Sequence, residues 1–69
     1  MKIIVNGAEL ELELELGAAT LAAALEALEY ADAVVATAVN GHFVPARARA
    51  TTRLAEGDRI EIVAPRQGG

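Results

Sequence analysis

Cysteine and tryptophan are absent from this chain of 69 residues, which holds one tyrosine, one phenylalanine and one histidine. Without cysteine there is no disulfide, no thiolate metal site and no cysteine nucleophile. The single histidine, His42, excludes a histidine-rich metal site and leaves no Ser-His-Asp constellation. The length fits one small domain, which must fold around a thin hydrophobic core that no disulfide reinforces.

Charge and hydropathy exclude further classes of protein. Ten acidic against six basic residues give a net charge of −4, whereas a nucleic-acid binder needs a basic face. Five arginines follow residue 45, but no aromatic platform lies near them. The longest mostly apolar stretches are far shorter than the roughly 20 residues that span a bilayer. With no signal-peptide pattern at the start, we expect a cytoplasmic protein that binds neither nucleic acid nor membrane.

The first half of the chain shows strand periodicity followed by helix periodicity. Residues 1–5 are rich in β-branched side chains, and Asn6-Gly7 predicts a type I′ hairpin turn. Strict alternation over residues 10–16 predicts a half-buried strand whose inner face carries Leu10, Leu12, Leu14 and Leu16. Thr20 suits a helix N-cap, and apolar spacing predicts a helix over residues 21–30 with its stripe formed by Leu21, Leu25 and Leu28.

The second half predicts three more strands and a free end. Strands are expected over residues 34–39, 42–44 and 59–63, with Asn40-Gly41 as a second hairpin turn and Ile60 and Ile62 facing inward. Residues 46–55 are expected to be irregular with at most a turn of helix, and residues 66–69 to be a mobile tail. The order β-β-α-β-β-β predicts a two-layer α+β fold with the helix on one face of the sheet.

The last two residues, Gly68 and Gly69, suggest chemistry at the chain end. An α-carboxyl group has a pKa of about 3.5, so the carboxylate of Gly69 is ionised and can attack a phosphorus atom. Adenylation would convert it into an activated acyl group that a sulfur or amine nucleophile attacks. Glycine lacks a Cβ, so a Gly-Gly end can thread a narrow active site.

Several segments together resemble one protein family. They are MKIIVNG at residues 1–7, the helix start at Thr20-Leu21 with Leu25, AVNGHFVP at residues 38–45, LAEGDRIEIV at residues 54–63, and the final QGG. In order and spacing the chain resembles the sulfur carrier proteins of thiamine biosynthesis, the ThiS family, within the ubiquitin-like β-grasp group. The resemblance implies a mixed sheet of four to five strands in residues 1–64 and a flexible tail over residues 65–69.

The resemblance also implies a mechanism and partners. A ubiquitin-activating-type adenylyltransferase (ThiF-like) would use ATP and Mg²⁺ to adenylate the carboxylate of Gly69, with Gly68 as its flexible approach. Sulfur from cysteine, delivered through a desulfurase persulfide, would give a terminal thiocarboxylate. That group would supply sulfur to a thiazole synthase (ThiG-like). The chain would be a protein co-substrate, not an enzyme, and would bind no cofactor or metal itself.

Four residues are candidates for partner contacts. Arg66 and Gln67 precede the two glycines and suit recognition of the tail. If Ile3, Val5, Ile60 and Ile62 face the helix, alternation places Ile4 and Val63 together on the opposite sheet face, where apolar side chains suit protein docking. The alternating glutamates of residues 9–15 form either a solvated face that prevents edge pairing or an acidic docking surface. His42 is expected to be an exposed turn residue, and Phe43 belongs either to the core or to a partner patch.

Three other functions remain open at this stage. The small subunit of molybdopterin synthase, or another ubiquitin-like carrier or modifier, would share the fold and the Gly-Gly end. A non-conjugating β-grasp binding module would use an exposed face and leave the tail dispensable. A plain structural domain would carry Gly-Gly by accident. Deletion of Gly69 separates the carrier from the last two.

Overall fold

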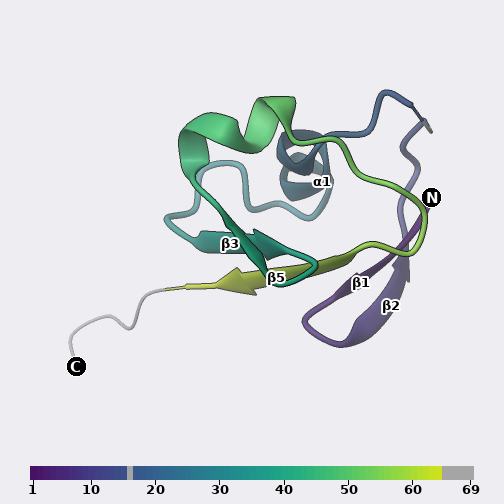
Figure 1. Ribbon diagram of the computed structural model, residues 1–69, viewed down its shortest axis with the longest axis horizontal. Helices are drawn as coiled ribbons and strands as arrows, with labels where there is room; N and C mark the ends of the chain where they lie inside the picture. Colours follow the sequence, from purple (N-terminus) through teal and green to yellow (C-terminus); the bar gives the residue numbers. More distant parts are fainter. Residues whose placement is uncertain (16, 65–69) are drawn as a thin grey trace.

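The computed structural model describes residues 1–15 and 17–64, which form a five-stranded sheet with two short helices on one of its faces (Figure 1). The strand order is β2-β1-β5-β3-β4. β1 and β5 run parallel, whereas the other neighbouring strands are antiparallel, so the sheet is mixed. The predicted two-layer α+β fold is confirmed.

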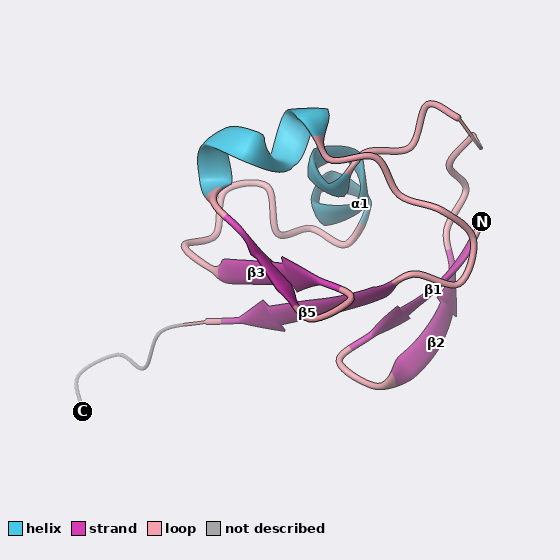
Figure 2. Cartoon of the chain, in the orientation of Figure 1, coloured by secondary structure: helices cyan, strands magenta, loops and turns pink. Residues whose placement is uncertain are grey.

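The elements follow the predicted order along the chain (Figure 2). The strands are β1 (Lys2–Val5), β2 (Ala8–Glu11), β3 (Ala36–Val39), β4 (His42–Val44) and β5 (Arg59–Val63). The helices are α1 (Leu21–Ala27) and the 3₁₀-helix η1 (Ala46–Thr51), which is the turn of helix expected in the irregular segment.

Two Asn-Gly pairs make the hairpin turns. Asn6 and Gly7 have φ angles of 49° and 87°, and Asn40 and Gly41 have φ angles of 50° and 85°. Positive φ at both central residues is what a two-residue hairpin turn requires, and asparagine and glycine adopt it most readily. The two predicted turns are confirmed.

Two strands are shorter than predicted, because their partner strands end first. The strand expected over residues 10–16 stops at Glu11, which pairs with Lys2 at the start of β1. The strand expected over residues 34–39 starts at Ala36, which pairs with Val63 at the end of β5. Four leucines are expected on the inner face of the first of these strands. Leu12 is buried and Leu14 is half-buried, whereas Leu10 is 36% exposed on the edge strand β2. Leu16 lies outside the described residues.

Helix α1 begins where predicted and ends three residues early. The Thr20 hydroxyl accepts a hydrogen bond from the N–H of Ala23 at 3.1 Å, so Thr20 is the N-cap. At the other end Glu29 has a φ of 65°, and the N–H of Tyr30 donates to the carbonyl of Leu25 at 2.7 Å. This left-handed residue and its hydrogen bond form a Schellman motif, which turns the chain away before residue 30.

The core lies between the helices and the sheet. Ile3 from β1, Ile60 from β5 and Leu21 from α1 are almost completely buried, as the predicted facing requires. Thr37 is the one buried polar residue described, and its hydroxyl donates to the carbonyl of Val44 at 2.8 Å. Arg49 in η1 donates to the same hydroxyl at 3.0 Å, so η1 is tied to β3.

The Asn6 side chain holds β5 in register beyond the end of β1. Its amide nitrogen donates to the carbonyl of Ile62 at 3.1 Å, and its amide oxygen accepts from the N–H of Ile62 at 2.9 Å. The main chain of Asn6 also donates to the carbonyl of Ile60 at 2.9 Å. The amide therefore continues the parallel ladder with β5 where β1 itself turns away.

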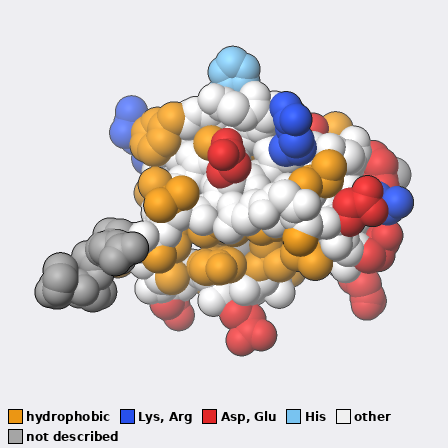
Figure 3. Space-filling model, turned by 90° about the horizontal axis from the view of Figure 1, so that it is seen from below, with side chains coloured by type: hydrophobic (Ala, Val, Ile, Leu, Met, Phe, Trp, Pro, Cys, Tyr) orange, Lys and Arg blue, Asp and Glu red, His pale blue; other side chains and the backbone are white. Residues whose placement is uncertain are grey.

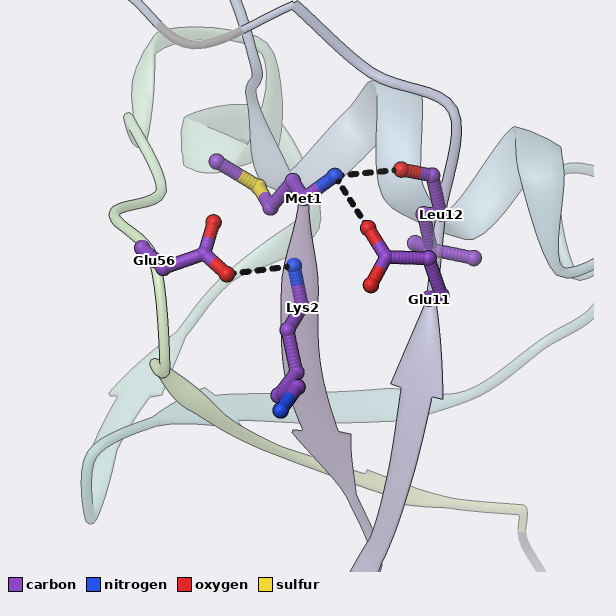
Figure 4. A network of polar contacts seen from close by, with 5 residues as sticks. All are labelled: Met1, Lys2, Glu11, Leu12 and Glu56. Carbon is purple, nitrogen blue, oxygen red and sulfur yellow. Dashed lines mark hydrogen bonds and ion pairs between the residues drawn. The ribbon is translucent and has the colours of Figure 1, made fainter.

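The N-terminus joins β1 to two neighbouring segments (Figure 4). The ammonium group of Met1 donates to the Glu11 carboxylate at 2.8 Å and to the carbonyl of Leu12 at 2.7 Å. The hydrogen bond from this ammonium, and then its charge, lower the pKa of Glu11. The main chain of Lys2 donates to the Glu56 carboxylate at 2.9 Å.

Replacing Asn6 with Gly tests how much the two hydrogen bonds between the Asn6 side chain and Ile62 of β5 stabilise the protein. Glycine keeps the positive φ of the turn but removes both side-chain hydrogen bonds to Ile62. We expect the free energy of unfolding to fall by about 1–3 kcal/mol, because two part-buried backbone groups lose their partners. Urea denaturation followed by circular dichroism measures this. A change in the free energy of unfolding of less than about 0.5 kcal/mol would show that these two hydrogen bonds do not stabilise the protein.

Glu11→Gln tests the contact with the N-terminus. Because the folded pKa of Glu11 is lowered, the contact stabilises the protein above the unfolded pKa and is lost as the pH falls through the folded value. The wild type should therefore have a higher melting temperature than the variant near neutral pH, and this difference in melting temperature should become smaller in acid. Melting curves of protein with a free Met1 terminus measure it, with Glu13→Gln as the matched control. A difference that stays constant with pH would contradict this expectation.

Candidate functional site

Strand β5 leads directly to the C-terminal residues. It lies in the middle of the sheet, parallel to β1 and antiparallel to β3, and ends at Val63. Ala64 is the last residue described, so the four tail residues singled out in the sequence, Arg66, Gln67, Gly68 and Gly69, lie outside the described residues. The described chain therefore ends one residue after β5, a strand that pairs with β1 on one side and with β3 on the other.

The side chains of β5 alternate between two faces of the sheet. Ile60 and Ile62 are buried in the core with the residues of α1. The alternation turns Arg59, Glu61 and Val63 to the other side, where all three are exposed. We call this side the open face, because both described helices lie on the opposite side of the sheet (Figure 1).

Strand pairing gathers apolar side chains at one end of the open face. Ala36 lies opposite Val63, Ala38 lies opposite Glu61, and Phe43 lies opposite Ala38. Phe43 is 70% exposed and Val63 is 62% exposed. Val34, just before β3, is 80% exposed. We define the apolar patch as Val34, Ala36, Ala38, Phe43 and Val63, and Figure 3 shows hydrophobic side chains gathered at this end of the face.

Three shallow hollows lie on or beside the open face. One of about 160 Å³ is lined by Ala36, Ala38, Phe43, Val63 and Glu61, among others. Another of about 320 Å³ is lined by Val34, Val35, Ala36 and Val63. A third of about 560 Å³ lies toward the hairpin turns and is lined by Ile4, Arg59 and Glu61 among others. Exposed apolar side chains around such hollows are typical of a surface that binds another protein.

The two partner-facing residues predicted in the described part of the chain differ in position. Ile4 and Val63 both lie on the open face, as their alternation predicts. Ile4 is half-buried opposite Arg59, which lies about 13 Å along β5 from Val63. Val63 therefore belongs to the apolar patch and Ile4 does not. Whether either residue contacts a partner stays a prediction.

Two exposed apolar residues were not assigned to a site by the sequence. For Phe43 the sequence is compatible with either the core or a partner patch, and the structure decides, because Val44 faces inward in the short strand β4 and so turns Phe43 outward. Val34 was expected within a strand, and its position outside one depends on where β5 ends. His42 is exposed beside the turn, as predicted.

Metal-binding clusters and membrane-spanning helices are absent from the described part of the chain. Residues 1–15 and 17–64 contain no group of three or more His, Asp or Glu side chains placed to hold a metal ion. No helix within those same ranges has the length and apolar character needed to cross a bilayer. The open face offers apolar area and one carboxylate beside the exit of β5, which suits contact with another protein.

Comparison with known proteins agrees with this geometry. The crystal structure of the thiamine biosynthesis protein (ThiS) from Geobacter metallireducens aligns with a TM-score of 0.80 and 28% sequence identity, over 100% of both chains. The likeness confirms the ubiquitin-like β-grasp fold. A search of curated proteins found no match.

The model of the ThiS family matches residues 3–69. The match includes every described strand and helix except the first residue of β1, and it extends through the two terminal glycines. The chain belongs to the ThiS family.

Proposed function

We propose that this protein is a sulfur carrier of thiamine biosynthesis whose working group is the C-terminal carboxylate of Gly69. The observation that carries the proposal is the ThiS family match, which runs from β1 through Gly68 and Gly69. The solved structure that aligns with the whole chain is itself described as a thiamine biosynthesis protein. These likenesses support a thiamine acceptor rather than the molybdopterin acceptor of related carriers.

The proposed reaction needs no side chain of this protein. A carboxylate oxygen of Gly69 attacks the α-phosphorus of ATP, and pyrophosphate leaves. Sulfur from a desulfurase persulfide then attacks the acyl carbon, and AMP leaves. Cleavage of the remaining sulfur–sulfur bond by a thiol gives the thiocarboxylate. The ATP and Mg²⁺ belong to the activating enzyme, and this chain is the co-substrate.

The position of β5 and the length of the chain after it are compatible with this role. Six residues lead from Val63 to Gly69, which span about 20 Å when fully extended. A partner can therefore hold Gly69 in a recessed active site while its surface rests on the open face. In this arrangement Gly68, which has no side chain, lets the chain end enter a narrow active site. The partner recognises Arg66 and Gln67 beside it. Val63 and Ile4 contact the partner's surface.

Two kinds of partner follow from the proposal. A ThiF-like adenylyltransferase activates Gly69, and a ThiG-like thiazole synthase receives the sulfur for the thiazole ring. Both must admit the same tail, so they bind this chain in turn rather than together. A cysteine desulfurase supplies the sulfur through the activating step.

Intact mass spectrometry tests the proposal. The protein is incubated with its cognate activating enzyme, Mg-ATP, a cysteine desulfurase and cysteine. We expect the mass to rise by roughly 16 Da, because sulfur replaces one carboxylate oxygen. The product should react with a thiol-alkylating reagent, although the chain contains no cysteine.

The matched control is the chain without Gly69, which should show neither the mass change nor alkylation. An equal change in both proteins would place the reactive group elsewhere and contradict the proposal. So would an unmodified wild type in a reaction whose enzymes are active on another carrier.

A further inference from the structure

One acidic side chain borders the apolar patch. Glu61 lies directly opposite Ala38, and Ala38 lies opposite Phe43 on its other side. Along β5, Val63 follows Glu61 on the same face at a distance of about 7 Å. Glu61 lines both the small hollow beside Phe43 and the larger hollow beside Ile4, so it is common to the two.

Within the described residues the Glu61 carboxylate makes no ion pair. Within residues 1–15 and 17–64 the ion pair present joins Met1 to Glu11, at the other end of the sheet. Arg59, the preceding residue on this face, makes no ion pair with Glu61 there. Water solvates Glu61 while the face is exposed. A partner that covers the patch removes this water, and a buried charge is unfavourable unless an opposite charge or strong hydrogen bonds meet it.

We propose that the activating enzyme places a lysine or arginine side chain against Glu61 and an apolar side chain in the hollow between Phe43 and Val63. This inference rests on the proposed function and adds to it the chemistry of the docking surface. The contact makes Glu61 the residue that selects the partner. An enzyme with an apolar or acidic residue at that point leaves the carboxylate unpaired.

Charge and reach favour this occupant over a second copy of the chain. A two-fold contact centred on the patch brings the two Glu61 carboxylates toward each other, and like charges in a covered interface are unfavourable. The protein that adenylates Gly69 must lie within the roughly 20 Å that the last six residues span from Val63. The apolar patch includes Val63, the residue from which this reach is counted, so it lies within that distance of the partner.

Steady-state adenylation kinetics with the cognate activating enzyme test the inference. The wild type, Glu61→Gln and Glu61→Arg are compared, with Glu26→Arg as the matched control. Glu26 is an exposed acid on α1, on the other side of the sheet, so this variant makes the same charge change away from the open face. Circular dichroism and thermal melting verify that each variant is folded.

We expect KM for the carrier to rise about 10-fold in Glu61→Gln and about 100-fold in Glu61→Arg, since like charges meet in the latter. The value of kcat at saturation should stay near that of the wild type, because the chemistry at Gly69 is unchanged. Glu26→Arg should keep the wild-type KM. This pattern supports the proposed pairing.

Two results would overturn the inference, and they have different meanings. If the wild type is adenylated and Glu61→Arg has the same KM as Glu26→Arg, the activating enzyme offers no cation at this point, and the proposed function stands. If the wild type is not adenylated by an enzyme that is active on another carrier, the proposed function fails and this inference fails with it.

Discussion

The central position of β5 is the constraint on which the rest of the structure depends. This strand pairs on one side with β1 and on the other with β3, and the Asn6 amide extends the first of these ladders to Ile62. β5 closes the core through Ile60, forms part of the open face through Val63, and leads to the C-terminal residues. A shift of one residue in its register would exchange these two sets of side chains.

Because side chains alternate along β5, the two faces of the sheet have different properties. One face packs against α1 and supplies the apolar burial that stabilises a small domain without disulfides. The other keeps apolar side chains exposed beside the strand end, where they contribute little to folding and remain available for contact. Under the proposed function the chain meets two enzymes in turn, and a docking surface on the open face would leave the core undisturbed.

The parts of the fold that local chemistry decides could be predicted from the sequence. Asn6-Gly7 and Asn40-Gly41 specify their turns, and Thr20 starts its helix, through interactions within a few residues. The ends of β2 and β3 could not be predicted, because they depend on where distant partner strands stop. The apolar patch could not be predicted for the same reason. It depends on the registers of both the β3–β4 and the β3–β5 pairs, which together bring Phe43 and Val63 to one face. Gly68 and Gly69 indicate a reactive chain end, but they are compatible with several functions, and only the resemblance to the ThiS family points to sulfur transfer.

In the proposed mechanism one partner engages the open face and the C-terminal residues together. Nuclear magnetic resonance of the ¹⁵N-labelled chain, titrated with the unlabelled activating enzyme, tests this residue by residue. We expect the perturbed amides to cluster in β3, β4 and β5 and in the residues after Ala64, while those of α1 and η1 stay unchanged. Perturbations centred on α1 and η1, with an unaffected open face, would contradict the proposed mechanism.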